Sequence, residues 1–401
     1  MKTGWNMLGL SIAAGCAAVY TVIHMNVTSI FLLLFTGSLL LLAVAVKLLA
    51  LNHVDIERIV QRAHFVEGES IRVRVHIRHV SYIPLFWMAV YERWENAVNG
   101  QEWVNRKLFF PLWRKNVSYA YELCHISRGI IDARSVEIVT GDLVGSMLKR
   151  KMVSTHDHVV VYPRPLDVKR LVWKAAGEGA KLLYRLLQPR DMMLQQIRDY
   201  RQGDSLRKIH WKSTAKTGSF KTKQEEDTRA SKLMIVLDAA QHAYSQDRSH
   251  CFEEAVRAAA GLLQYAFQES MQVQLVSTDS RYSAAALEQG VGLHAGYEQL
   301  SRLQADGKRA ISEVVHDLLP QAAGQLMIVL TPNAQDELLH VMKGAASRQA
   351  GVFLLSEFSV PTIDDRKNLR RISDAGIPCS VIPCRAASAE IPYIREAAEV
   401  G

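Results

Sequence analysis

The residues with the greatest potential for chemistry lie in one short basic stretch, residues 198–223. It holds eight Lys or Arg residues and two Asp residues, with Tyr200 and Trp211 among them. Such a stretch can bind phosphate groups or nucleic acid, because its cations neutralise the charge of the ligand. A structural role is the alternative, in which Asp204 caps a short helix and pairs with a nearby arginine. The stretch contains no carboxylate cluster for Mg²⁺ and therefore does not indicate a nuclease.

A second group of polar residues follows predicted strands in the C-terminal half. Apolar runs at residues 232–237, 271–277, 325–330, 351–355 and 377–382 alternate with helical patterns, which favours an α/β domain with a doubly wound, mainly parallel sheet. Ligands of such sheets bind beyond the carboxyl ends of the strands. The residues expected there are Asp238, Thr278, Asp279, Thr331 and Ser356. No dinucleotide-binding glycine motif, P-loop or nucleophile elbow occurs, so we expect no cofactor.

The N-terminal 51 residues differ from the rest of the chain. Residues 5–23 and 30–46 carry no charge, and apolar residues continue to position 51, so both runs are long enough to cross a bilayer. Lys2 precedes the first run, while Lys47, Arg58 and Arg62 follow the second. We predict a transmembrane helical hairpin, at about 5–23 and 30–51, with both ends in the cytoplasm. The alternative is a cleaved signal peptide that begins at Lys2.

Residues 55–165 are expected to form a small antiparallel β-sandwich. The strict alternation at residues 71–78 is typical of a half-buried strand, and further strand-like runs lie at 86–93, 107–112, 117–123, 130–138 and 159–162. The outer face of the first of these strands is basic. Two interpretations of that face stay open, a solvated strand surface and a contact with acidic lipid headgroups.

Residues 166–231 are interpreted as a linker that carries the basic stretch, and residues 232–401 as the α/β domain. Within the linker, residues 180–187 are expected to be helical and Pro189 to limit that helix. The whole chain has 401 residues, of which 49% are hydrophobic, and a net charge of +8. These values exclude a disordered chain, and five scattered cysteines exclude a disulfide scaffold.

The basic stretch resembles the signature of the bacterial domain of unknown function 58 (DUF58) family. The usual pattern of that family is R-x-Y-x-x-G-D-x-x-R-x-I-x-W-x-x-x-A-R, and Lys216 stands here at its last position. The residues taken from it as a signature or partner surface are Arg198, Tyr200, Gly203, Asp204, Arg207, His210, Trp211 and Lys212. The segments 128–129, 141–145 and 161–165 agree with the family as well.

This resemblance implies two transmembrane helices, a β-rich segment and a von Willebrand A-like domain. It also implies a MoxR-type AAA ATPase as partner, with a transglutaminase-like membrane protein as a further candidate, and no established catalytic activity. The von Willebrand A fold often holds Mg²⁺ through D-x-S-x-S after its first strand, whereas this chain has Asp238, Ala240 and His242 at the three positions. Because Mg²⁺ needs several oxygen ligands, we expect no metal at this degenerate motif.

Together these observations favour a non-enzymatic, membrane-anchored adaptor in the cytoplasmic membrane, with no nucleic acid expected as partner. The alternative is an enzyme or binder that acts on an anionic, phosphate-bearing envelope precursor or on nucleic acid through the stretch 198–223. The structure of the partner surface is expected to depend on Asp204, Arg207 and Trp211. Trp211 is expected to be buried, so that Trp211→Ala lowers the free energy of unfolding by a few kcal/mol, the usual effect of emptying a buried aromatic site.

Overall fold

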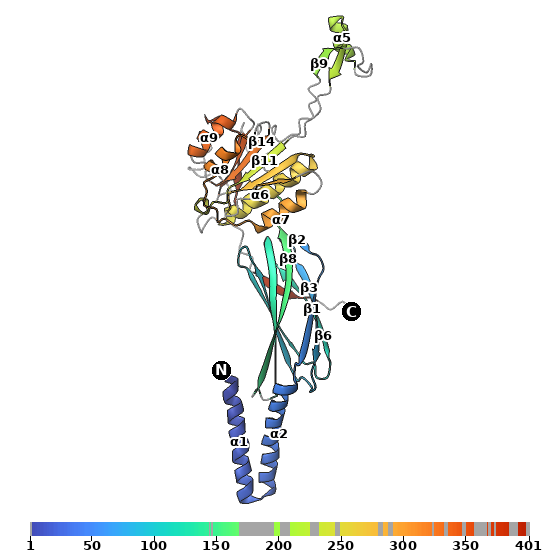
Figure 1. Cartoon of the computed structure of the whole chain (residues 1–401), viewed down its shortest axis with the longest axis vertical. Coiled ribbons are helices and arrows are strands. Elements are labelled where there is room, and N and C mark those ends of the chain that lie inside the picture. Colours follow the sequence, from blue (N-terminus) through green and yellow to red (C-terminus); the bar gives the residue numbers. More distant parts are fainter. Residues whose placement is uncertain are drawn as a thin grey trace. The chain divides into compact units, whose positions relative to one another are not determined.

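The computed structural model divides the chain into two units, which are described separately (Figure 1). The first comprises Met1–Tyr162 and Glu390–Gly401, and the second Pro163–Ala389. The expected helix at 180–187 and the signature residues Gly203, Asp204 and Arg207 lie outside the described residues. The residues described are 2–143, 145, 147–167, 196–200, 209–224, 232–244, 249–279, 284–287, 292–322, 325–332, 336–346, 350–356, 367, 370–372, 374–384 and 392–397.

The N-terminal apolar runs form two helices, α1 (Lys2–His24) and α2 (Val27–Leu49). Ser29 fixes the start of α2, because its hydroxyl accepts a hydrogen bond from the Asn26 amide at 3.1 Å. Thr21 of α1 donates its hydroxyl to the Ser29 carbonyl at 3.0 Å, which ties the two helices together at the turn. Among the described helices, α2 is long and apolar enough to cross a membrane by length and composition. The second predicted span and the orientation stay predictions.

The β-rich segment forms two sheets that share one core. One has the order β1-β3-β6-β17 and the other β2-β8-β7-β4-β5, and all the pairings are antiparallel except that of β2 with β8. The alternation predicted for 71–78 is confirmed in β3, where every second side chain is buried. The other strand bounds are β1 (His53–Val60), β2 (His64–Val66), β3 (Ile71–Val80), β4 (Met88–Asn96), β5 (Glu102–Phe109), β6 (Asn116–Cys124), β7 (Gly129–Gly141) and β8 (Leu148–Tyr162).

The fourth strand of the first sheet comes from the far end of the chain. β17 (Tyr393–Glu396) pairs antiparallel with β6, and Lys107 of β5 forms an ion pair with Glu396. The sequence suggested that the α/β domain extends to residue 401. This boundary is corrected, because the last strand, β17, belongs to the first unit. β17 is short and mostly exposed, so its sequence carries no strong strand pattern.

The second unit contains a six-stranded sheet of order β13-β12-β11-β14-β15-β16. Its pairings are parallel except at the edge, where β13 runs antiparallel to β12. The antiparallel edge strand was not predicted, since its four residues are three alanines and a leucine. The strand bounds are β11 (Lys232–Leu237), β12 (Gln272–Ser277), β13 (Ala284–Leu287), β14 (Leu326–Thr331), β15 (Ala350–Ser356) and β16 (Cys379–Pro383).

Both faces of the central strand β11 are covered. Leu233 and Ile235 belong to a core cluster with residues of α6 (Ser249–Gln268) and α7 (Gly292–Arg302). Met234 and Val236 point into a second cluster with α8 (Ile311–Leu318) and α9 (Asp336–Ala346). Burial on both faces explains the continuous apolar run of β11. Residues 367, 370–372 and 374 are helical, while residues 366, 368, 369 and 373 lie outside the described residues.

Candidate functional site

The described part of the signature forms a small ribbon with a short helix. β9 (Gln196–Asp199) pairs antiparallel with β10 (Lys221–Gln224), which places Arg198 opposite Thr222. Tyr200 lies against Phe220, with ring centroids 6.1 Å apart, and its amide donates to the Phe220 carbonyl. Lys221 forms an ion pair with Asp199 at 2.6 Å across the ribbon. We call β9, β10 and the helix α5 between them the signature ribbon.

His210 begins the helix α5 (Trp211–Thr217). Its Nδ1 accepts a hydrogen bond from the Ser213 amide at 3.1 Å, which satisfies one of the free donors at the start of the helix. Gly218 ends the helix with a φ of 69°, a backbone conformation that glycine adopts without strain. The role of His210 in this structure is therefore a helix cap.

Trp211 does not lie where the sequence suggested. Its side chain is 65% exposed, and the neighbouring Lys212 is exposed as well. The expectation of a buried Trp211 is corrected, because α5 buries none of its residues. Phe220 is 58% exposed, so the ribbon presents large apolar side chains together with lysines.

The strand-end group forms a second candidate site, centred on Asp238 after β11. Both carboxylate oxygens of the buried Asp238 are used locally: Oδ1 accepts from the Ala240 amide at 3.1 Å, and Oδ2 from the Thr331 hydroxyl at 2.8 Å. Thr278 accepts a hydrogen bond from the Ala239 amide at 2.7 Å. The expected strand-end residues Asp238, Thr278 and Thr331 are thus brought together by direct hydrogen bonds.

Burial raises the pKa of Asp238, although its hydrogen bonds with Ala240 and Thr331 act in the opposite direction. A raised pKa means that the environment disfavours the charged carboxylate. Asp279 is held separately, since its carboxylate accepts from the Ser277 hydroxyl at 2.7 Å. Ser356 is the last residue of β15, and its side chain lies outside what the structure describes.

Backbone closes over this strand end. The Gly307 amide donates to the Ala239 carbonyl at 2.9 Å, and the Gln241 amide donates to the Gly307 carbonyl at 2.8 Å. A Cβ atom at Gly307 would lie 1.8 Å from the Thr278 carbonyl oxygen, so the segment fits only because it has no side chain there. Ala240 is buried and His242 is exposed.

The degenerate motif offers few ligands for a cation. Ala240 offers no side-chain ligand, and both oxygens of Asp238 are already used in hydrogen bonds. Within the described ranges no group of three His, Cys, Asp or Glu side chains lies close enough together to hold a metal ion.

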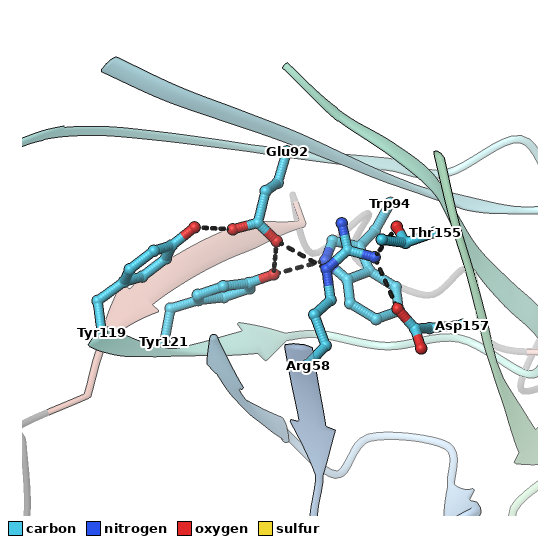
Figure 2. Close-up of polar contacts among 7 residues, drawn as sticks. All are labelled: Arg58, Glu92, Trp94, Tyr119, Tyr121, Thr155 and Asp157. Carbon is cyan, nitrogen blue, oxygen red and sulfur yellow. Dashed lines mark hydrogen bonds and ion pairs between the residues drawn. The ribbon is translucent and has the colours of Figure 1, made fainter. Parts of the chain in front are cut away.

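A buried polar network in the sandwich was missed by the sequence analysis. Glu92 of β4 accepts hydrogen bonds from the hydroxyls of Tyr119 and Tyr121 on β6, and its ion pair with Arg58 of β1 measures 3.2 Å (Figure 2). The Arg58 and Glu92 side chains have no exposed surface. The network therefore joins the two sheets through charged groups that water does not reach.

One further strand, β8, and a second residue of β4 complete the surroundings of Arg58. Its Nη1 donates to Thr155 at 2.7 Å and to Asp157 at 2.8 Å, both on β8, while the guanidinium lies 5.3 Å from the ring centroid of Trp94 (Figure 2). Arg58 was counted above as a basic residue that follows the predicted membrane helices, but its charge is paired inside the core. The signal for the network is Glu92 itself, a carboxylate on the inward side of β4 between Val90 and Trp94.

Burial, and after it the Glu92 carboxylate, raises the pKa of Tyr119 and Tyr121 well above the usual tyrosine range. Both phenols therefore stay protonated and act as hydrogen-bond donors to Glu92. Trp94 in turn donates its indole N–H to the Tyr121 hydroxyl at 2.7 Å. A network of this kind holds a fixed geometry and offers no free nucleophile.

Comparison with known proteins matches residues 196–383 to the family model described as protein of unknown function DUF58. The matched segment begins at β9 and ends at the last residue of β16. The segment 196–383 thus resembles the DUF58 family. The signature ribbon and the Asp238 group lie inside this matched segment, whereas α1, α2 and the Glu92 network lie outside it.

A relative extends the likeness beyond the family segment. The uncharacterized protein YeaD of Bacillus subtilis (strain 168) is 23% identical over 357 residues, which cover 86% of this chain and 87% of YeaD. Among solved structures, a von Willebrand factor type A protein from Catenulispora acidiphila matches with a TM-score of 0.25 and 14% identity, covering 41% of this chain and 40% of its own. The CARDB domain of a Pyrococcus furiosus protein matches with a TM-score of 0.18 and 11% identity, covering 27% of this chain and 87% of its own. TM-scores this low carry no argument.

Proposed function

We propose that this protein is a non-enzymatic, membrane-anchored adaptor that binds a protein partner through the signature ribbon. The observation that carries the proposal is the exposure of Trp211 on a basic ribbon. Tryptophan is the residue type most enriched at the energetic centres of protein interfaces. A large apolar side chain that stays in water gains free energy when a partner covers it.

The partner proposed is a MoxR-type AAA ATPase, and a transglutaminase-like membrane protein is a further candidate. The residue resemblance to the family is the support for these two names. The charge of the ribbon adds a physical criterion, since Lys212, Lys216 and Lys221 favour an acidic docking surface. Rim charges of this kind act mainly on the association rate and on its dependence on salt.

The proposed anchor is the hairpin of α1 and α2, with both of its ends in the cytoplasm. Support comes from the 23-residue apolar helix α2 and from the lysines that flank the two apolar runs. Beyond the anchor, the proposal assigns the second unit to a doubly wound, von Willebrand A-like fold. Its strand order and the antiparallel edge strand β13 support that assignment.

The proposed partner binding does not use a bridging metal. Asp238 is buried, bonded on both oxygens and covered by the Gly307 backbone, so a partner carboxylate has no cation to coordinate there. The protein-binding role is therefore assigned to the signature ribbon.

A second candidate function is binding of a phosphate-bearing ligand, such as an envelope precursor or a nucleic acid. The observation in its favour is the eight Lys and Arg residues between positions 198 and 223. Binding driven by phosphate contacts falls steeply as salt rises, and it does not need the indole of Trp211. Salt dependence and the effect of Trp211→Ala therefore separate the two functions.

The test places a photo-crosslinking amino acid at position 211 of the full-length protein in native membranes. A matched control carries the same amino acid at position 113, because Trp113 is 73% exposed and lies in the first unit. Crosslinked products are identified by mass spectrometry. We expect an AAA ATPase to be crosslinked from position 211 and not from position 113.

Two results would contradict the adaptor proposal. One is the absence of any protein adduct at position 211 although the control position reacts. The other is an adduct with a phosphate-bearing small molecule or with nucleic acid that disappears at high salt, which would favour the second function.

A further inference from the structure

The C-terminal end of α2 is built into the β-sandwich. Val46, Ala50 and Leu51 are buried in the sandwich core. Lys149 of β8 donates its ammonium group to the Ala50 carbonyl, and Lys151 donates to the Asn52 carbonyl at 2.8 Å. The helix and this end of the sandwich therefore form one continuous body.

Three connections of the sandwich lie at the same end as α2. Their described residues are 81–87, 110–115, and 142, 143, 145 and 147, which we call the anchor-side loops. The Tyr82 amide donates to the Leu49 carbonyl at 3.2 Å, and Leu85 pairs with Leu112 across two of the loops. Gly141 and Leu148, which flank the third loop, face each other where β7 meets β8.

Helix length sets the depth of these loops. The 23 residues of α2 extend over about 34 Å at 1.5 Å per residue, close to the roughly 30 Å of a bilayer hydrocarbon core. If α2 crosses a bilayer, Leu49 lies near the boundary between the acyl chains and the headgroups. The hydrogen bond from Tyr82 to Leu49 puts the first anchor-side loop at that same depth.

The anchor-side loops expose large apolar side chains next to the helix. Tyr82 is 69%, Phe110 68%, Trp113 73% and Leu143 63% exposed. Tyrosine and tryptophan are enriched where proteins meet the membrane–water interface, because each has an apolar body and a polar end. Clustered exposure of such side chains is unusual on a surface that faces water alone.

The exposed charged residues of these loops are all positive. Arg114 and Lys115 are exposed in the loop 110–115, and Lys47 is exposed in the last turn of α2. Loops 81–87 and 110–115 contain no Asp or Glu, and Asp142 of the third loop is buried. The loop 97–101, between β4 and β5 at their opposite ends, has neither an aromatic nor a charged residue.

We propose that the anchor-side loops bind the surface of an anionic phospholipid membrane. In this arrangement Tyr82, Phe110 and Trp113 insert at the level of the headgroups, and Arg114 and Lys115 contact lipid phosphates. The inference rests on the proposed membrane anchor and adds to it a second, peripheral contact made by the sandwich. A membrane surface is assigned as the ligand of these loops because they adjoin the apolar helix α2 and because their exposed charged residues are positive.

The experiment uses the full-length chain with Cys16→Ser and Cys379→Ser, because these two cysteines are not buried. The protein is reconstituted into vesicles of phosphatidylcholine with or without phosphatidylglycerol. An environment-sensitive fluorophore is attached after Trp113→Cys, and the matched control is Asn99→Cys in the loop 97–101. Lipids with a spin label near the headgroup end of the acyl chain quench a fluorophore only when it lies in the bilayer interface. Flotation of the vesicles reports separately whether the protein is anchored.

We expect several-fold stronger quenching at position 113 than at position 99, and a further increase when phosphatidylglycerol is present. The combined change Arg114→Glu and Lys115→Glu should remove that increase while the protein still floats with the vesicles. Equal, weak quenching at both positions in floating protein would overturn the inference and leave the anchor intact. Shielding of position 113 from aqueous iodide without quenching by lipid would overturn it, because protein and not lipid would then cover the position. Protein that fails to float would overturn the anchor, and the inference with it.

Discussion

The Glu92 network makes a quantitative prediction about the stability of the sandwich. Arg58→Ala removes the cation that faces Glu92 and leaves a carboxylate with no exposed side-chain surface. Breaking a buried ion pair by removing one partner typically costs about 3–5 kcal/mol, because the remaining charge stays in the protein interior. The two tyrosine hydroxyls still donate to Glu92, which favours the lower half of that range.

The chain offers a matched control in the same unit. Arg72 of β3 pairs with Glu122 of β6 at 2.7 Å, but the Arg72 side chain is 44% exposed. Pairs in contact with water contribute about 0–1 kcal/mol. Arg72→Ala therefore removes the same functional group at a small expected cost, so that a comparison of the two variants isolates the effect of burial.

Native-state hydrogen exchange of the full-length protein in detergent micelles measures this difference. Each 1.4 kcal/mol changes an equilibrium constant about tenfold, so the slowest amides of β4 and β6 should exchange roughly 100- to 1,000-fold faster in Arg58→Ala. In Arg72→Ala the same amides should change by about fivefold or less. The combined change Arg58→Met and Glu92→Leu should be less destabilising than Arg58→Ala alone, because an apolar pair leaves no buried charge.

The reasoning is refuted if Arg58→Ala and Arg72→Ala accelerate exchange equally. It is also refuted if the double variant is less stable than Arg58→Ala. Either result would mean that water or structural relaxation reaches Glu92, against the full burial of both side chains.

Three other predictions concern the second unit. Trp211→Ala should change the free energy of unfolding by about 0.5 kcal/mol or less because the side chain is exposed, and a melting temperature lowered by many degrees would contradict the exposure. Gly307→Ala should lower the free energy of unfolding by about 1–3 kcal/mol and speed amide exchange in residues 238–244, because the new Cβ would clash with the Thr278 carbonyl. An unchanged exchange rate would show that the backbone at Gly307 is not tightly packed against Thr278. Since the pKa of Asp238 is raised, folding favours its protonated form, and its contribution should make the unit less stable as pH rises above the ordinary value of 3.8. Asp238→Asn should abolish this dependence in urea unfolding followed over pH, and identical slopes for the two proteins would refute the assignment.

Strands with strict alternation could be predicted from the sequence. The pattern at 71–78 fixed the buried face of β3, because a side-chain period of two leaves little freedom of register. The continuous apolar run of β11 likewise indicated a strand buried on both faces. β13 and β17 could not be predicted in this way, since four residues without alternation give no period to read.

Less of the candidate site than of the fold could be predicted from the sequence. Trp211 was expected to be buried, but a seven-residue helix has no periodicity that separates a buried face from an exposed one. Glu92 carried a usable signal, its inward position, whereas its partners on β1 and β6 depend on tertiary structure. The meeting of Asp238 with Thr278 and Thr331 followed from the rule that parallel strands end at one edge.

The pairing of β17 with β6 has a consequence for biosynthesis. β6 ends at residue 124 and β17 begins at residue 393, so the ribosome makes the entire DUF58 segment between the two strands. Until β17 emerges, β6 is an open edge of its sheet, with unpaired backbone groups that can recruit another strand. A nascent chain therefore carries an incomplete sandwich, already attached to α2, throughout the synthesis of the second unit. Premature termination anywhere in that unit leaves this edge permanently open, and such truncated products are expected to aggregate.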